Sequence, residues 1–518
     1  MKLRARMICQ MSSSQGLKGC SLALALALSA CGGQQAGSAP ATAAEAPGVA
    51  PAASSEVASG VAAATEAALA SLPEPGPPPA WAPPSPMAWK LNSGSRVLYR
   101  KHGNVPLVSL LLVIPRGSET DPVGKEGLTN LMADLLDEGA GKLDALALSE
   151  KLQGLATELQ IMASTDGMAL SMNVITETFA PALDVLADVV RRPKLDEKEF
   201  QRRKAQWIAQ AVASEADPHY GRRVTTLRAL YGKGYAGGLP QGTRDSLEAI
   251  SYADVKAHYK RLMAAEGTTF IVTGGIEQEA VKRELDRTFG DWAGQPSTEA
   301  RPLAPNAATG KLFLSNYTGA AQSVIGVVRR VPGTDAEDLF ASTVFNRSFG
   351  ESFTARVNLN LREDKGYTYG ASSLFQRFRQ VGLFGVFADV RADATRASLD
   401  EILRELADVC GSRPLTVKER DDAVNGLLLG YPQTFESIEL LGGRFAEIPL
   451  QNRPLDWFER WPSRLAAVTL EQANQAAKSY CQRSDFVIVV AGDAATVAPT
   501  LDGIGFDLVK VDARGQVL

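Results

Sequence analysis

Histidine is scarce in this sequence, and its spacing excludes one kind of metal site. The 518 residues contain only His102, His219 and His258, and no two of them lie four residues apart. A helix presents two imidazoles to one zinc ion only when the histidines are one turn apart. No helix of this chain can therefore carry paired histidine ligands.

Cysteine and an excess of charge of one sign are also lacking. Five cysteines in 518 residues exclude a disulfide-stapled scaffold and a cysteine-rich metal domain. The formal net charge is −4 and no stripe of lysine and arginine stands out, so nucleic-acid binding has little support. The composition, 45% hydrophobic and 22% charged, is typical of a soluble protein with a real core. At roughly 100–200 residues per domain, the length predicts two to four domains.

The first thirty residues are typical of an export signal. Four basic residues and no acidic residue precede or flank an apolar stretch at 21–30, which is too short for the roughly 20 residues that span a bilayer. Residues 28–31, Leu-Ser-Ala-Cys, resemble the bacterial lipobox, which implies lipidation of Cys31 after cleavage. Because Gly32 follows, the resemblance implies an outer-membrane lipoprotein that faces the periplasm. The alternative is a plain secretory signal with a coincidental cysteine.

Residues 31–86 differ in composition from the rest of the chain. Alanine, proline, serine and glycine dominate, and the only charged side chains are those of Glu45, Glu56, Glu66 and Glu74. Such a segment buries too little apolar surface to offset its chain entropy, so we expect a disordered tether. Its proline-rich end, 73–86, should be locally stiff polyproline II.

The body of the chain repeats itself. The apolar runs VSLLLVIP and SVIGVVRRVP end at Pro115 and Pro332, and FIVTGG and VIVVAG end at Gly275 and Gly492. Both pairs are 217 residues apart (332 − 115 and 492 − 275). Two landmarks with one offset indicate a duplicated domain of roughly 200 residues. We expect domains at 87–297 and 306–518, joined by a linker near 295–308.

Each half mixes strands with helices without strict βα alternation, which predicts an α+β fold. Period-two and apolar runs predict strands, and periods near 3.6 predict helices. In the first half we expect strands at 97–99 and 108–114 and helices at 127–138, 180–190 and 196–211. In the second half we expect a helix at 355–362 and a strand at 367–376.

Four motifs follow one another along the chain: PRGSETDPVGKEGL at 115–128, Asp-Glu-Gly at 137–139, the segment that begins PQGTRDSL at 240, and LREDKGYTYGASS at 361–373. In this order they resemble the pitrilysin/insulinase (inverzincin) zinc peptidases. The resemblance covers about residues 90–515 and implies two homologous α/β-sandwich halves. In this family a first-half helix carries H-x-x-E-H, whose histidines bind zinc and whose glutamate is the general base. A distal glutamate completes the ligands.

The sequence departs from the family at all of these positions. The motif positions are Asn130, Ala133 and Asp134, and the distal glutamate position is Gln210. Asparagine is a poor zinc ligand and alanine cannot take a proton, so we expect no metal and no cofactor in this chain. A hard-cation site on Asp134, Asp137 and Glu138 is an alternative, but carboxylates at this spacing are usually a solvated helix face.

The second half keeps a different part of the family pattern. Arg362 and Tyr369 match an Arg and a Tyr that reach the metal site in the family, where the resemblance implies that they stabilise the transition state. Tyr369 would donate to the oxyanion and Arg362 would hold a substrate carbonyl. Alternatively, Arg362 complements a helix dipole and Tyr369 packs in a sheet. We expect Tyr367 to share the strand face of Tyr369, which leaves the register open.

Two functions of different class follow. The first is a non-catalytic subunit of a heterodimeric zinc endopeptidase, inactive alone, which supplies Arg362 and Tyr369 in trans to a homologous partner that carries H-x-x-E-H and the zinc ion. Its substrates would be peptides or unfolded segments. The second is a lipid-anchored peptide-binding or scaffold pseudoenzyme with no role in catalysis.

Cys410 and Cys481 could pair in an oxidising compartment, although two buried thiols are the simpler expectation.

Overall fold

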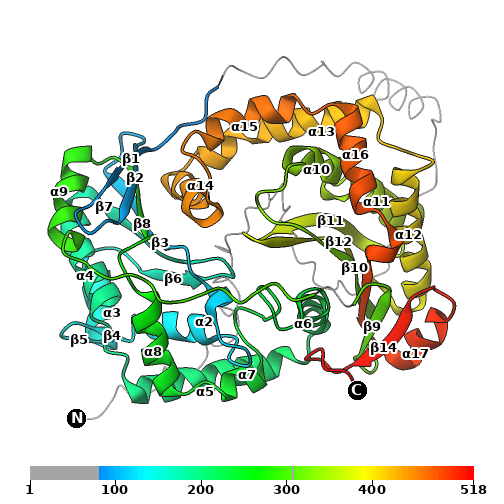
Figure 1. The fold of residues 1–518 in the computed structure, drawn as a ribbon, viewed down its shortest axis with the longest axis horizontal. Coiled ribbons are helices and arrows are strands. Elements are labelled where there is room, and N and C mark those ends of the chain that lie inside the picture. The colour runs from blue at the N-terminus through cyan, green and yellow to red at the C-terminus, as the bar shows by residue number, and fades with distance from the viewer. Residues whose placement is uncertain (1–80, 306–307) are drawn as a thin grey trace, which may run out of the picture. The chain divides into compact units, whose positions relative to one another are not determined.

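The computed structural model describes residues 81–305 and 308–518, and the predicted signal peptide, Cys31 and most of the tether lie outside them. The first half is built on a six-stranded sheet in the order β1-β2-β8-β3-β7-β6 (Figure 1). β2 and β8 are parallel and the other neighbours are antiparallel. The strands are β1 (Met87–Lys90), β2 (Arg96–Lys101), β3 (Leu107–Ile114), β6 (Gln160–Ala163), β7 (Met168–Ile175) and β8 (Thr269–Gly274).

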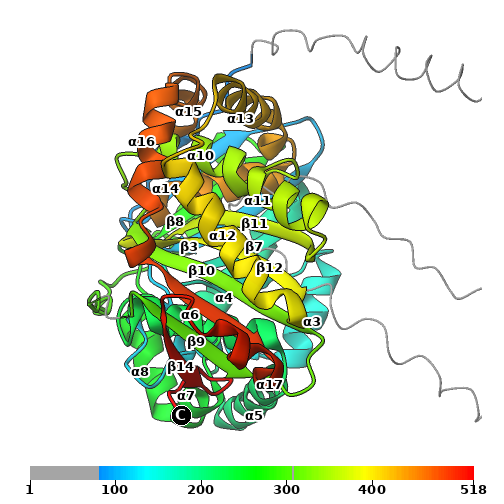
Figure 2. The same ribbon diagram turned by 90° about the vertical axis from the view of Figure 1, so that its right-hand side faces the viewer.

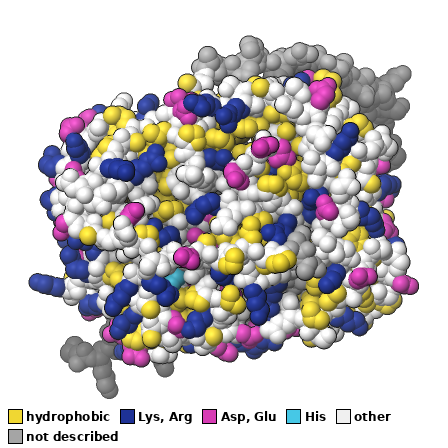
Figure 3. All heavy atoms as spheres, viewed as in Figure 1, with side chains coloured by type: hydrophobic (Ala, Val, Ile, Leu, Met, Phe, Trp, Pro, Cys, Tyr) yellow, Lys and Arg dark blue, Asp and Glu magenta, His cyan; other side chains and the backbone are white. Residues whose placement is uncertain are grey.

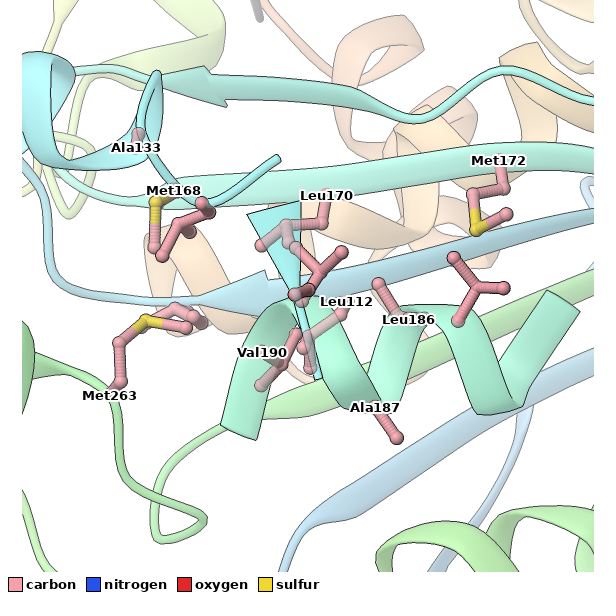
Figure 4. Packing of buried hydrophobic residues seen from close by; sticks show 14 of the residues in the cluster. Leu112, Ala133, Met168, Leu170, Met172, Leu186, Ala187, Val190 and Met263 are labelled. Atoms are coloured by element: carbon pink, nitrogen blue, oxygen red, sulfur yellow. The ribbon is translucent and has the colours of Figure 1, made fainter. Parts of the chain in front are cut away.

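Helices of the first half pack on one face of this sheet. The alternate residues Leu110 and Leu112 of β3 point into a core that includes Leu186 and Val190 of α4, as Figure 4 shows for Leu112, Leu186 and Val190. The elements of this half are α2 (Leu128–Ala133), β4 (Gly139–Ala140), β5 (Leu143–Asp144), α3 (Ala145–Gly154), α4 (Phe179–Arg191), α5 (Glu197–Ser214), α6 (Pro218–Tyr231), α7 (Arg244–Glu248), α8 (Tyr252–Leu262) and α9 (Gln278–Phe289).

The second half repeats this design. Its sheet has the order β11-β12-β10-β13-β9-β14, and β3 and β8 have their counterparts in the antiparallel pair β10 and β13. The edge strands differ, because β1 is antiparallel to β2 whereas β14 is parallel to β9. The strands are β9 (Lys311–Asn316), β10 (Gln322–Pro332), β11 (Thr368–Arg377), β12 (Val381–Arg391), β13 (Val487–Gly492) and β14 (Asp507–Val511). The predicted α+β class with two homologous halves is confirmed.

The helices of the second half include two turns of π type, which are uncommon in proteins. Figure 2 shows α12 lying across the sheet, where it contacts β10 and β12. The elements are α10 (Leu339–Asn346), the π turn η3 (Arg347–Glu351), α11 (Arg356–Asn358), the π turn η4 (Leu359–Asp364), α12 (Thr395–Cys410), α13 (Val417–Gly430), α14 (Ile438–Gln451), α15 (Trp457–Ala466), α16 (Leu470–Tyr480) and α17 (Ala494–Val497).

The two halves cover each other's sheets. Leu111 and Val113 of β3 face away from the first core and are buried against α14 of the second half, with Phe445 among their neighbours. In return, α6 of the first half packs on β10 and β13 of the second sheet and places Val224 in one cluster with Val489. Each sheet is thus covered on one face by a helix from the other half.

Three sequence expectations need correction or refinement. The helix expected at 127–138 ends at Ala133, because the following backbone bonds, such as Leu136 N–H to Ala133 O, join residues three apart and tighten the turn. Cys410 and Cys481 form a disulfide with Cα atoms 6.3 Å apart, so the expectation of two thiols is wrong. Residues 82–86 of the expected tether lie on the main unit, where Pro83 and Pro86 are buried.

The charge pattern of one face and the length of the helices can be compared with the expectations from the sequence. Lys and Arg side chains are interspersed with Asp and Glu over the face that Figure 3 shows. Within residues 81–305 and 308–518, every helix is too short or too polar to cross a bilayer.

Candidate functional site

The degenerate metal positions of the first half lie on and just after α2. The side-chain amide of Asn130 donates to Pro240 O at 2.7 Å, and Ala133 is buried. The Asp134 carboxylate pairs with Arg203 and accepts a hydrogen bond from Trp207 Nε1 at 2.7 Å. The two polar groups that replace the motif histidines are therefore already bonded within the chain.

Helix α5 supplies the partners of Asp134. Arg203 also lies 3.1 Å from Glu138, and Arg202 lies 2.7 Å from the same carboxylate. Gln210, the distal ligand position, is exposed on α5, where its amide is 3.5 Å from Ser214 Oγ. Burial raises the pKa of Asp134, while the bonds from Trp207 and Arg203 lower it.

These residues do not fit a zinc ion or a hard cation. The set of Asn, Ala, Asp and Gln offers a single strong ligand, and a guanidinium is paired with it. The alternative set for a hard cation, Asp134, Asp137 and Glu138, does not lie on one face of α2, since α2 ends before Asp134, and Asp134 and Glu138 are paired with arginines. Among the described residues, no three His, Cys, Asp or Glu side chains come close enough to hold a metal.

A buried network that sequence reasoning missed holds the start of α2. Asp121 accepts hydrogen bonds from Gly127 N at 2.9 Å, from Thr129 N at 2.8 Å and from Thr129 Oγ1 at 2.6 Å. Thr129 Oγ1 also lies 2.8 Å from His258 Nε2 and 3.3 Å from Gly117 O. Burial lowers the pKa of His258 to about 4, which favours the neutral imidazole. Burial raises the pKa of Asp121 to about 7.

Arg362 and Tyr369 lie in the second half on neighbouring elements. Arg362 is on η4, with its guanidinium 4.5 Å from the centre of the Phe353 ring and its Nε 3.3 Å from Glu363. Its side chain is 36% exposed. Tyr369 is the second residue of β11 and is 92% exposed, which makes it the most exposed large apolar side chain of the described residues. Tyr369 is therefore exposed to solvent, and Arg362 is partly so.

The structure separates the two tyrosines that the sequence placed on one face. Tyr367 precedes β11 and packs against the core of the second half, whereas Tyr369 is exposed. The pairing of β11 with β12 shifts register between Thr368 and Ala371, so simple alternation fails here. The expectation of a shared face is wrong, and Tyr369 is the tyrosine available to a ligand.

The degenerate positions and the Arg362–Tyr369 region are not bonded to each other. Within the part of the chain that the structure describes, no hydrogen bond or ion pair joins Arg362 or Tyr369 to the α2 positions. The segments that carry Arg362 and Tyr369 are instead joined to each other, since Tyr367 N–H donates to Leu361 O at 2.9 Å and Gly366 N–H donates to Arg362 O at 3.2 Å.

A duplicated α+β fold with paired six-stranded sheets and substituted metal positions defines a metallopeptidase-like protein that has lost its own metal centre. Residues 96–233 match the family described as "Insulinase (Peptidase family M16)", and residues 249–427 match "Peptidase M16 inactive domain". The chain belongs to peptidase family M16 and is an inactive homologue in that family.

Similar proteins include members described as non-peptidase or inactive and members described as proteases. The "Non-peptidase homolog YmxG" of Helicobacter pylori is 19% identical over 397 residues, which are 77% of this chain and 91% of that protein. The crystal structure of the peptidase M16 inactive domain from Pseudomonas fluorescens superimposes with a TM-score of 0.73 at 22% identity and covers 79% of this chain and 98% of that one. The periplasmic protease PqqL from Escherichia coli has a TM-score of 0.66 at 15% identity, with 82% of this chain covered but only 50% of PqqL.

Proposed function

We propose that this chain is the non-catalytic subunit of a two-chain zinc endopeptidase and that it supplies Arg362 and Tyr369 to the active site of its partner. The observation that carries this proposal is the contrast in bonding. The polar groups at the metal positions are bonded within the chain, whereas Tyr369 is 92% exposed and Arg362, on the neighbouring turn, is 36% exposed. An exposed phenol and a partly exposed guanidinium on neighbouring elements are donors without a substrate in this chain alone.

The chemistry needs donors of this kind. Hydrolysis of an amide passes through a tetrahedral intermediate with a negatively charged oxygen, which preorganised donors stabilise. Tyr369 would donate its hydroxyl proton to this oxygen, and Arg362 would hold a neighbouring backbone carbonyl of the substrate. The partner would be a homologous chain with H-x-x-E-H and its zinc ion, and the substrates would be peptides or unfolded segments.

Two comparisons support a two-chain assembly. This chain matches half the length of PqqL, and it matches 95% of a structure of the first half of that protease, with a TM-score of 0.65. A protease can therefore contain two units of this size in one chain. The relative named as a non-peptidase homolog supports a non-catalytic role for such a unit when it is a separate protein.

The cell envelope is the compartment that we propose. The Cys410–Cys481 disulfide supports an oxidising compartment such as the periplasm, because cytosolic thiols are kept reduced. Lipidation of Cys31 would anchor the chain in the outer membrane. Replacing Cys31 with Ser should release the protein from washed membranes into the soluble periplasmic fraction. Radiolabelled palmitate that fails to enter the wild-type chain would contradict the anchor.

The test of the catalytic role is Tyr369→Phe in the complex that co-purifies with the tagged chain. The change removes one hydroxyl donor and leaves the exposed ring in place, so assembly should be intact. Loss of one oxyanion donor typically lowers turnover about 10²–10³-fold, or roughly 2.7–4 kcal/mol. Since the donor acts only in the transition state, kcat should fall with little change in KM.

Tyr367→Phe is the matched control, because Tyr367 packs against the core rather than facing outward. It should leave peptide hydrolysis nearly unchanged. Full activity of a stable complex that carries both Tyr369→Phe and Arg362→Ala would mean that the chain is a scaffold or peptide-binding subunit only, and the proposal would be wrong.

A further inference from the structure

We propose that Asn358 and Asn360 are positioning residues, which fix the turn that carries Arg362 to the strand that carries Tyr369. This inference rests on the function proposed above. Neither asparagine is exposed, and each lies within four residues of Arg362 on α11 or η4. Their side chains bond in opposite directions, one to β11 and the other to α12.

Asn360 ties the turn to α12. Its side-chain nitrogen donates to Glu405 Oε1 at 2.7 Å and to Glu401 Oε2 at 3.0 Å. Asn360 is 6% exposed and Glu405 is 3% exposed, so these bonds are made away from water. One amide group thus lies between two carboxylates of α12. It ties the backbone two residues before Arg362 to that helix.

Asn358 ties the same turn to β11. Its side-chain oxygen accepts a hydrogen bond from Ala371 N at 3.1 Å, two residues after Tyr369. Its side-chain nitrogen donates to Phe353 O at 2.7 Å, in the segment whose ring lies against the Arg362 guanidinium. One buried amide therefore connects the supports of Arg362 and Tyr369.

The base of this arrangement is itself anchored. Arg356 of α11 binds Glu419 through two bonds of 2.6 and 2.7 Å, and it donates to Pro414 O at 3.0 Å. Arg413 pairs with Glu405, and the disulfide at Cys410 joins the end of α12 to the end of α16. The turn of Arg362 is thus bonded to a helix that an ion pair and a disulfide join to other parts of the second half.

A held turn matters because Arg362 has no rigid partner of its own. Its ion pair is with the exposed Glu363, and an exposed pair of this kind contributes little. The π turn is also an uncommon geometry, which needs outside support. Misplacing a positioning group by about 1 Å can lower the rate about 10²-fold. Loss of the asparagine hydrogen bonds should therefore lower the rate of peptide hydrolysis.

The experiment is Asn360→Asp, in the purified chain and in the co-purified complex. The variant places a third carboxylate against Glu401 and Glu405. In the chain alone, the amides of Lys365, Gly366 and Tyr367, which bond back to residues 360–362, should exchange hydrogen faster. In the complex, kcat/KM should fall about 10-fold or more.

A double-mutant cycle separates positioning from general damage. If Asn360 acts through Arg362, Asn360→Asp should lower kcat/KM by less than about twofold in a complex that already carries Arg362→Ala. Glu405→Gln in the Asn360→Asp background re-forms an amide–carboxylate bond with the roles reversed and should restore part of the activity. Asn316→Asp, an exposed amide on β9, is the matched control and should change neither exchange nor activity.

The outcomes distinguish this inference from the proposed function. If Arg362→Ala lowers activity and Asn360→Asp does not, only the positioning role is wrong. If Asn360→Asp lowers activity equally with and without Arg362, the asparagine is merely structural and the inference is also wrong. If neither Arg362→Ala nor Tyr369→Phe affects hydrolysis, the proposed function fails, and the positioning role fails with it.

Discussion

The two regions that resemble parts of a family M16 active site differ in how their side chains are bonded. After α2, Asp134 is surrounded by donors from α5, chiefly Arg203 and Trp207. At the start of β11, the Tyr369 side chain is exposed to solvent. The hydrogen bonds of this region are made by the backbone and by buried asparagines such as Asn358. The first arrangement stabilises this chain, whereas the second leaves its side chains exposed or partly exposed to solvent. Loss of a metal site has thus left a structural bond in one half and an exposed pair in the other.

The largest effects should come from Arg362 and Tyr369, and they should have no parallel at the metal positions. In the complex, Arg362→Ala should lower kcat/KM by about 10²-fold, with changes in both kcat and KM, because the guanidinium would hold the substrate carbonyl before and during the reaction. Asn130→Ala in the same complex should stay within about twofold. Peptide-hydrolysis kinetics on both variants measure this contrast. Equal losses would remove the distinction between the two regions.

For the free energy of unfolding, a substitution at the metal positions should have the larger effect and a substitution at Tyr369 the smaller one. Asp134→Ala leaves the Arg203 guanidinium and the Trp207 N–H without their shared partner, which should lower the free energy of unfolding by about 1–3 kcal/mol. Tyr369→Phe changes an exposed position and should stay within about 0.5 kcal/mol. Urea denaturation of the purified chain compares them. A larger loss in Tyr369→Phe would contradict the contrast drawn here.

Buried acids near α2 should make stability depend on pH. Burial raises the pKa of Glu119 to about 8, although the nearby Arg379 lowers it. Because the folded state favours the protonated form, this stabilisation is full at acid pH and is lost as the pH rises toward 8. Asp121 acts with the same sign, and His258 acts oppositely only below its ordinary pKa of 6.5.

Between about pH 7 and about pH 8.5 the unfolding free energy should therefore fall, by on the order of 1 kcal/mol. Thermal unfolding at the two pH values measures this change. Glu119→Gln keeps the shape of the side chain without its charge and should flatten the dependence. A wild-type melting temperature that rises across this window would show that Glu119 is ionised in the folded state.

The metal content of the purified chain should change least of all between the wild type and its variants. The purified chain should hold zinc well below one ion per molecule and should cleave no peptide by itself, and Asp134→Ala should leave that content unchanged. Elemental analysis after dialysis measures it. A stoichiometric zinc signal that disappears in Asp134→Ala would overturn the description of the first half.

Local patterns predicted most of the elements, because strands and helices leave their period in the sequence. The run at 108–114 became β3, and the helix predicted at 196–211 became α5. The pattern could not show that Leu111 and Val113 are covered by α14, since the covering residues are hundreds of positions away. It also overextended α2, where Leu135 and Leu136 keep the apolar spacing but sit in a tighter turn.

The site was predicted only as far as the family motifs reach. Those motifs singled out Asp134 and Tyr369, but they did not reveal Arg203 or Trp207 as the partners of Asp134. Pairs such as Asn360 with Glu405 are polar, buried and far apart along the chain, so no local period marks them. The register shift after Thr368 explains why alternation misplaced Tyr367.

The exchange of covering helices has a consequence for biosynthesis. The outer face of the first sheet, with Leu98, Leu111, Val113 and Ile271, is covered by α14, which the ribosome makes long after β8. Until residue 451 has been polymerised, a nascent first half must keep this apolar face exposed. Such a face is a binding site for chaperones and a route to aggregation. A truncated gene product that ends in the linker would therefore be a client of cellular quality control rather than a half-sized stable protein.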